Sequence, residues 1–158
     1  MVALFPRFAL KRLTVSAKAA DETSDMFEWK PEYSVQIPKI DAQHQQLFVL
    51  AAELHNAMSQ GKGKAVLKQS LARLIEYTKV HFACEEQLMN QYHYPEVVAH
   101  KAQHDQLTAQ VVDLHKRFLS GETTLTITLM VFLKNWLERH IAASDQQYSV
   151  HIRGKAAA

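Results

Sequence analysis

The sequence contains a single cysteine, Cys84, among its 158 residues. One thiol excludes an internal disulfide and fits a reducing compartment, so we expect a cytoplasmic protein. Four glycines and four prolines are too few for the many turns of a chain built from short strands. No stretch approaches the roughly 18 consecutive apolar residues that predict a transmembrane helix. We therefore expect no membrane span.

The chain also lacks an excess of either charge. Lys and Arg number 18 and Asp and Glu number 16, which gives a formal net charge of +2 with the signs interspersed. The sequence has no stripe of basic residues that would indicate nucleic-acid binding. No feature specifies a protein partner, and we expect a monomer. A length of 158 residues with 47% hydrophobic content suits one globular domain.

Residues 1–25 differ from the rest of the chain because they are basic and only mildly amphipathic. Basic residues precede the first acid, Asp21, at four positions: Arg7, Lys11, Arg12 and Lys18. They interrupt the apolar residues, so the segment has no continuous signal-peptide core. We interpret residues 1–25 as an N-terminal extension. It is a disordered arm, a targeting arm, or a segment upstream of a true start at Met26.

Helical periodicity predicts an all-α fold for the remainder. Helix formers such as Leu, Ala, Gln, Glu and Lys dominate, and the helix breakers fall between four periodic segments. We expect Asp41 to cap the first helix and Pro95 to lie in the first turn of the third. The expected helices span about residues 41–60, 65–91, 95–120 and 123–148.

Short connections between long helices predict an antiparallel up-down-up-down four-helix bundle, because consecutive helices then become neighbours. We assign this bundle to residues 26–150, preceded by the N-terminal arm. Residues 151–158 are expected to form a polar C-terminal tail that is frayed.

Nine histidines are the anomaly of the composition. A lone buried histidine is usually a core residue with a hydrogen-bond partner. Here polar groups interrupt the apolar stripe of every expected helix, and antiparallel packing brings them to one end of the bundle. Burying such a cluster without a cation would be very costly, so the pattern predicts a metal site. Its members are His44, His81, Glu85, His100, His104 and His140.

Spacing refines this prediction. Residues four apart lie on one helix face, which suits His100 and His104 as neighbouring ligands of one metal. His81 and Glu85 have the same spacing, and a carboxylate such as that of Glu85 can bridge two metals.

Asp145 lies five residues after His140, which turns it about 140° away in a regular helix. We predict a π-bulge, or the end of regular helix, between Ala142 and Asp145 that directs this carboxylate toward the metals. Asp105 also follows a histidine by five residues, but we interpret it as a solvated surface acid. Glu86 is expected to point away from the cluster.

Other chemistry-bearing residues receive structural interpretations. Cys84 is expected to be a small core thiol rather than a redox-active group. Four histidines are expected to be structural or solvated: His55, His93, His115 and His151.

Four segments resemble the bacterial hemerythrin family: residues 37–44, 81–86, 94–104 and 136–145. The resemblance covers about residues 26–148. It implies two iron ions with a bridging oxo or hydroxo group and reversible binding of dioxygen. It assigns His100, His104 and His140 to one iron, His44 and His81 to the other, and Glu85 and Asp145 as bridges. It also places six residues near the dioxygen pocket: Leu47, Phe82, Met89, Trp136, Leu137 and Ile141.

Two octahedral irons offer about twelve coordination positions, and the implied ligands fill about eleven. One position on the iron with two histidines stays open for dioxygen. We therefore predict a dioxygen carrier, storage protein or sensor and not an enzyme. The alternative is a di-iron enzyme that acts on peroxide, nitric oxide or damaged iron centres.

Overall fold

The computed structural model describes residues 26–157, and the expectation for residues 1–25 lies outside that range. The elements, in chain order, are the 3-10 turn η1 (Pro31–Tyr33), helices α2 (Pro38–Ser59), α3 (Lys64–Gln91), α4 (Val97–Ser120) and α5 (Ile127–Arg139), the π-helix η2 (His140–Asp145) and helix α6 (Gln146–Ala156). The described residues are all helix, turn and loop.

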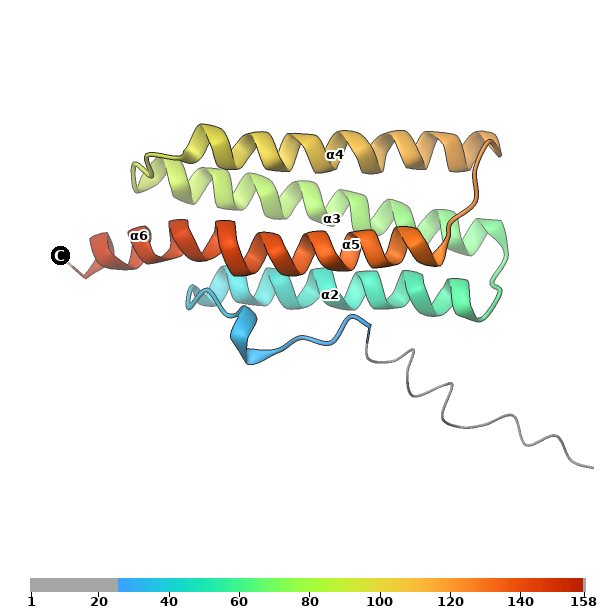
Figure 1. Ribbon diagram of the computed structural model, residues 1–158, viewed down its shortest axis with the longest axis horizontal. Coiled ribbons are helices and arrows are strands. Elements are labelled where there is room, and N and C mark those ends of the chain that lie inside the picture. The colour runs from blue at the N-terminus through green and yellow to red at the C-terminus, as the bar shows by residue number, and fades with distance from the viewer. Residues whose placement is uncertain (1–25, 158) are drawn as a thin grey trace, which may run out of the picture.

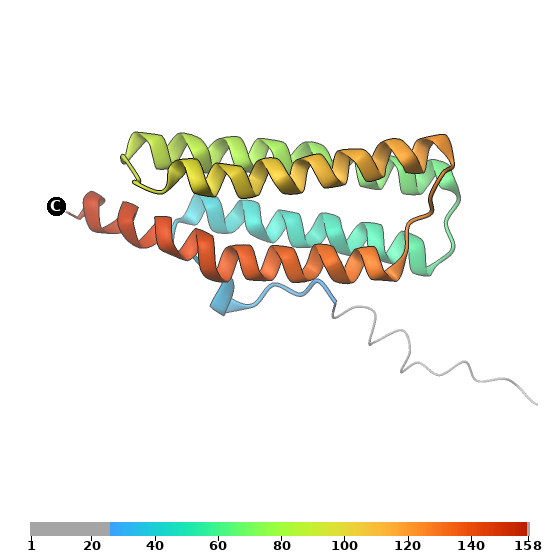
Figure 2. The same ribbon diagram turned by 45° about the horizontal axis from the view of Figure 1, so that its top comes forward.

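The helices form an antiparallel four-helix bundle (Figures 1 and 2). We call each of the four long helical segments of the bundle a rod. The fourth rod consists of three elements, because α5 continues through η2 into α6 with helical backbone angles at both junctions. The α2–α3 turn and the α4–α5 connection lie at one end of the bundle, and the α3–α4 turn lies at the other. The predicted fold class is therefore confirmed. Within residues 26–157, no helix is long and apolar enough to cross a membrane.

Helix α2 begins earlier than predicted, at Pro38, and its N-cap is Ile37 rather than Asp41. Proline suits the first turn because the missing amide hydrogen has no partner there in any case. Asp41 instead accepts hydrogen bonds from the Val35 amide at 2.8 Å and the Ser34 hydroxyl at 2.7 Å. Its carboxylate therefore fixes the segment that leads into the helix.

The starts of the third and fourth rods also differ from the prediction. Helix α4 begins at Val97, so Pro95 lies in the preceding turn. Helix α5 begins at Ile127 and not near residue 123, because the Thr126 side chain caps it by accepting from the Leu129 amide at 3.2 Å. The predicted end of α4 is confirmed, since Gly121 adopts the left-handed conformation with φ of 85°.

The predicted frayed tail is wrong over the described residues, because α6 continues to Ala156. Tyr148 and Ser149 are fully buried, and Ile152 is 5% exposed. Tyr148 and Ile152 are four residues apart and pack in one cluster with Met89 and Tyr94. This apolar face holds the C-terminal helix against the bundle.

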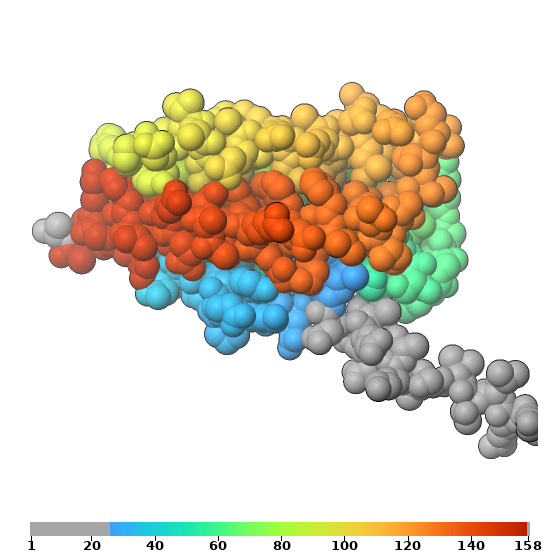
Figure 3. Space-filling view, in the orientation of Figure 1, coloured from blue at the N-terminus to red at the C-terminus, as the bar shows by residue number. Residues whose placement is uncertain are grey.

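The segment before α2 lies against the bundle beside the fourth rod (Figure 3). The Tyr33 hydroxyl donates to Glu138 of α5 at 2.7 Å, and the Gln146 amide donates to the Ser34 carbonyl at 2.8 Å. Phe27 is 5% exposed and belongs to the main hydrophobic core. These contacts extend the bundle's core with residues that precede its first helix.

Candidate metal centre

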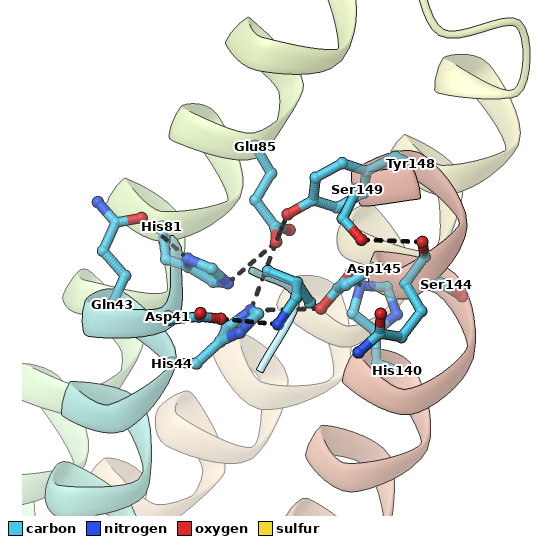
Figure 4. A network of polar contacts seen from close by, with 12 residues as sticks. Asp41, Gln43, His44, His81, Glu85, His140, Ser144, Asp145, Tyr148 and Ser149 are labelled. Carbon is cyan, nitrogen blue, oxygen red and sulfur yellow. Dashed lines mark hydrogen bonds and ion pairs between the residues drawn. The ribbon is translucent and has the colours of Figure 1, made fainter. Parts of the chain in front are cut away.

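The seven predicted ligands meet in one buried layer of the bundle. Helix α2 contributes His44, α3 contributes His81 and Glu85, and α4 contributes His100 and His104, while η2 contributes His140 and Asp145. All seven side chains are between 0% and 5% exposed. Figure 4 shows His44, His81, Glu85, His140 and Asp145 pointing toward a common centre. The predicted convergence at one end of the bundle is present in the structure.

The predicted distortion after His140 is also present. Residues His140–Asp145 form a π-helix, in which five residues separate hydrogen-bonded partners. This wider turn brings residues five apart to the same face. Asp145 Oδ1 consequently lies 3.2 Å from His140 Nε2.

Glu85 presents one oxygen to each of two histidine groups. Its Oε1 atom lies 3.5 Å from Nε2 of both His44 and His81. Its Oε2 atom lies 3.1 Å from His104 Nε2 and 3.7 Å from His100 Nε2. The carboxylate is thus shared between the two groups.

Asp145 is shared in the same way. Its Oδ2 atom lies 3.3 Å from His44 Nε2, and its Oδ1 atom lies 3.3 Å from His100 Nε2 and 3.2 Å from His140 Nε2. Potential ligand atoms therefore form two groups within 4.8 Å: Glu85, His100, His104, His140 and Asp145 in one, and His44, His81 and Glu85 in the other.

Hydrogen bonds from the outer ring nitrogens orient several of these histidines. His81 Nδ1 lies 3.1 Å from the Gln43 side-chain oxygen, and His140 Nδ1 lies 3.1 Å from that of Gln103. An amide oxygen only accepts, so each Nδ1 carries the proton and donates. Each Nε2 is then a bare lone pair that faces the centre, as a metal ligand requires.

Several of the atoms that face the centre lie against one another or lack a hydrogen-bond partner. His104 Nε2 lies 3.1 Å from His100 Nε2 and 3.0 Å from His140 Nε2. His44 Nε2, Glu85 Oε2 and both Asp145 oxygens are buried without an oriented hydrogen bond. Converging lone pairs and unsatisfied carboxylate oxygens are stable together when a cation lies between them. Imidazole and carboxylate ligands suit iron, so the residues present fit a di-iron group.

The two carboxylates have opposite pKa shifts. Burial raises the pKa of Asp145 to about 7, and the charge of Glu85 adds to the effect. Burial also opposes ionisation of Glu85, but His81 and the adjacent imidazoles of His100 and His104 outweigh it and hold the pKa of Glu85 well below its ordinary value. Without metal, Asp145 therefore takes up a proton at a higher pH than Glu85 does.

The histidines divide in a similar way. Burial lowers the pKa of His81 to about 4 and that of His140 to about 3. Burial acts in the same direction on His44, but the nearby carboxylates of Asp145 and Glu85 overcome it and raise the pKa of His44 to about 9. A metal that uses His44 must therefore displace a proton.

Tyr148 supports the shared carboxylate and was missed by the sequence analysis. Its hydroxyl donates to Glu85 Oε1 at 2.6 Å, and the side chain is fully buried (Figure 4). Burial raises the pKa of Tyr148 far above its ordinary value. The phenol therefore remains a proton donor to Glu85.

The sequence analysis also missed three side chains that contact the Nδ1 atoms of site histidines: Gln43, Gln103 and Glu86. A sequence signal exists for the amides, because Gln immediately precedes both His44 and His104 in a repeated Ala-Gln-His triplet. Each glutamine reaches the histidine of the next rod rather than its own neighbour. Glu86 does point away from the centre, as predicted, but its Oε1 atom lies 3.2 Å from His104 Nδ1.

An apolar cavity of about 50 Å³ lies inside the bundle next to the layer. Four of the six residues expected near a dioxygen pocket line it: Leu47, Phe82, Trp136 and Leu137. Phe82 stacks on His104 with ring centroids 3.7 Å apart, and Trp136 stacks on His140 with centroids 4.3 Å apart. The cavity wall therefore contacts the histidines directly.

The other two expected pocket residues do not line this cavity. Met89 is fully buried in the separate cluster around Tyr148 and Ile152. Ile141 is fully buried in the main core. Met89 lies beyond Glu85 on α3, whereas the α3 residues of the cavity, Leu74 to Phe82, lie before Glu85.

The remaining predictions concern residues outside the layer. Asp105 is a surface acid, as predicted, and pairs with Lys101 at 2.8 Å with 65% of its side chain exposed. Cys84 is a free, half-buried thiol that packs against the main core. None of the other four histidines belongs to either group of potential metal ligands within residues 26–157. They are His55, His93, His115 and His151.

Comparisons with known proteins agree with this geometry. The family model of the hemerythrin HHE cation binding domain matches residues 35–150, so the chain belongs to the hemerythrin family. The chain is 34% identical over 117 residues to bacteriohemerythrin of Methylococcus capsulatus, covering 74% of this chain and 88% of that protein. It is 34% identical over 125 residues to bacteriohemerythrin of Pseudomonas aeruginosa, covering 79% and 80%.

A solved structure supports the same conclusion about the fold. The crystal structure of wild-type hemerythrin superposes with a TM-score of 0.76 at 31% identity, covering 79% of this chain and 96% of that chain. A hemerythrin-like protein of Naegleria gruberi is 27% identical over 122 residues, covering 77% of this chain and 90% of that protein.

Proposed function

We propose that this protein binds dioxygen reversibly at a di-iron centre, as a carrier, store or sensor. The observation that carries the proposal is the sharing of Glu85 and Asp145, each of which offers one oxygen to each histidine group. This arrangement suits two adjacent metal ions. Membership of the hemerythrin family supports iron as the metal and dioxygen as the ligand.

The ligand assignment is part of the proposal. His100, His104 and His140 would hold one iron and His44 and His81 the other, with Glu85 and Asp145 shared between the two groups. The distances within each group support this division. The group with two histidines has fewer protein ligands, so we place the open position for dioxygen there.

When bound, two ferrous ions supply the electrons and the open coordination position that dioxygen needs. The chain's own residues set the conditions. Neutral imidazoles favour the ferrous state more than additional carboxylates would. The apolar walls formed by Leu47, Phe82 and Trp136 admit a small diatomic molecule and exclude water. Exclusion of water slows the loss of charged oxygen species and so favours release of dioxygen unchanged.

The setting of this activity is also proposed. A lone, half-buried Cys84 is compatible with a reducing, cytoplasmic compartment. Within residues 26–157 the described surface scatters its large exposed apolar side chains over several helices, which supports action as a monomer.

The test is to load the protein anaerobically with ferrous salt, measure iron per chain, and record optical spectra before and after air. We expect two irons per chain and a charge-transfer band that appears with dioxygen and disappears under vacuum. Far less than two irons would overturn the proposal. Rapid irreversible decay with turnover of peroxide or nitric oxide would instead support a di-iron enzyme.

A further inference from the structure

The outer partners of the site histidines are chemically unequal. His81 and His140 each donate to a neutral amide oxygen, of Gln43 and Gln103 respectively. His104 Nδ1 instead lies 3.2 Å from a carboxylate oxygen, that of Glu86. This distinction falls on one metal group only, because His104 belongs to the group of three histidines.

His44, in contrast, has no acceptor for its outer ring nitrogen. Its Nδ1 atom is buried and has no hydrogen-bond partner, and Trp29 lies nearby with ring centroids 6.4 Å apart. The group of two histidines therefore contains one ring supported by an amide and one ring with no outer acceptor. The Nδ1 atoms of this group therefore have weaker hydrogen-bond acceptors than those of the other group.

A carboxylate acceptor strengthens an imidazole as a metal ligand. The N–H donor shifts electron density toward the ring when its acceptor is anionic, so the inner nitrogen becomes more basic. A more basic ligand stabilises the ferric ion more than the ferrous ion, because the ferric ion carries more charge. It also increases the affinity of the position for any divalent metal.

From these contacts we propose that Glu86 acts through His104 as a positioning and redox-tuning residue. It makes the metal position of His100, His104 and His140 the tighter and more readily oxidised of the two. The inference rests on the proposed function and adds an asymmetry to it. The position away from the open coordination site then gives up its electron more easily, while the position of His44 and His81 stays ferrous more readily.

Lys101 moderates this effect. Its Nζ atom lies 3.5 Å from Glu86 Oε2 and 2.8 Å from Asp105. The Glu86 side chain is 22% exposed and that of Lys101 is 50% exposed, so the ion pair faces solvent. Lys101 offsets part of the negative charge on Glu86, and salt screens the remainder only incompletely because His104 is buried.

The central experiment compares the wild-type protein with Glu86→Gln, which keeps a hydrogen-bond acceptor and removes the charge. We expect the affinity for a redox-inert divalent probe, Co²⁺, to fall about tenfold at one of the two metal positions. Tenfold is the lower end of the usual loss of metal affinity when the hydrogen-bond partner of a ligand histidine is changed. In iron-loaded protein, spectroelectrochemical titration should show one oxidation step made about tenfold less favourable. For a one-electron step this is about 59 mV toward higher potential.

Two further variants should shift the potential of this metal position in the opposite direction, toward lower values. Gln103→Glu places a carboxylate against His140 and should lower the potential of the same position. Lys101→Met removes the counter-charge of Glu86 and should also lower it, by less. Glu76→Gln is the matched control, because Glu76 lies on the same helix, pairs only with Lys79 among described salt bridges, and is 73% exposed.

Opposite shifts for Glu86→Gln and Gln103→Glu, with Glu76→Gln unchanged, would support the inference. A purely structural role of Glu86 would lower iron content without moving the potential of the iron that remains, and would overturn it. Unchanged potentials in variants that hold two irons would overturn it as well. A wild-type chain that fails to hold two irons overturns the proposed function itself, and iron content separates the two failures.

Discussion

Asp145 and His140 are five residues apart, yet Oδ1 of the first lies 3.2 Å from Nε2 of the second. A regular helix would separate their directions by about 140°. The π-helix of residues His140–Asp145 removes this separation. A local backbone irregularity therefore lets one rod supply both an imidazole and a shared carboxylate.

His140→Ala should reduce iron from two per chain to one or fewer. His140 Nε2 lies among the nitrogen and oxygen atoms of the larger ligand group, so its loss removes a direct ligand. Iron analysis after anaerobic loading and desalting measures the effect. His115→Ala is the control, because His115 lies outside both groups, and equal iron in the two variants would refute the ligand assignment.

Metal affinity should increase with pH between about 6 and 9. At pH 6 the metal-free protein holds protons on His44, whose pKa is raised to about 9, and on Asp145, whose pKa is raised to about 7. Both protons must leave when metal binds. His81 and His140 have lowered pKa values and are already neutral in this range.

The expected slope follows from proton counting. Affinity should rise about tenfold per pH unit between 7 and 9, where His44 alone releases a proton, and more steeply below 7. Titrations with Co²⁺ and a competing chelator at several pH values measure the slope. An affinity independent of pH over this range would contradict the assignment of His44 as a ligand.

Tyr148→Phe should destabilise the metal-free protein by about 1.5–3 kcal/mol, the usual contribution of a hydrogen bond to a charged group. Its hydroxyl donates to the buried Glu85 at 2.6 Å, and phenylalanine leaves that oxygen without the donor. Urea unfolding compares the two proteins. Tyr92→Phe, at a half-buried position, should change the free energy of unfolding much less.

Ala51→Val should slow both binding and release of dioxygen while leaving the affinity nearly unchanged. Ala51 lines the cavity of about 50 Å³, so two added methyl groups occupy space next to the layer and not a ligand position. Because the added methyl groups enter an existing cavity, the free energy of unfolding should fall by no more than about 1–3 kcal/mol, the usual cost of a small-to-large core substitution. Stopped-flow measurements test the rates, with the exposed Ala109→Val as control. Rates equal to those of the wild type would show that dioxygen does not use this cavity.

Ile152→Ala tests whether the C-terminal helix is part of the folded domain. Ile152 is 5% exposed and packs with Met89, Tyr94 and Tyr148. Its truncation should cost about 2 kcal/mol, as for other buried large-to-small substitutions. A frayed tail would give a change within about 0.5 kcal/mol. Thermal or urea unfolding distinguishes the two results.

Periodicity and spacing were sufficient to predict the bundle and six groups of the layer, all but Asp145, because both depend on geometry that repeats along a helix. The π-helix was predictable because His140 and Asp145 could not otherwise face the same centre. Helix starts were less predictable. Asp41 has the chemistry of a cap, but Pro38 begins α2 and the Asp41 carboxylate binds the preceding segment instead.

The second layer of residues was not predicted, since it depends on contacts between rods. Gln43 and Gln103 reach histidines 38 and 37 residues away. Tyr148 reaches Glu85 across 63 residues. Met89 was assigned to the pocket by resemblance, but its height along α3 places it beyond Glu85, in the cluster with Ile152.

The layer ties four rods together at one level, while the far half of the bundle is held by apolar contacts around residues such as Leu54, Leu71 and Met130. Removal of metal by a chelator should therefore loosen the layer, while the apolar half of the bundle stays packed and the cluster of Met89 and Ile152 still holds α6. Amide hydrogen exchange should then accelerate together in the start of α2, the end of α3, the start of α4 and η2. The end with the α2–α3 turn should keep its protection, so that metal-free chains open from one side and close again around an incoming ion.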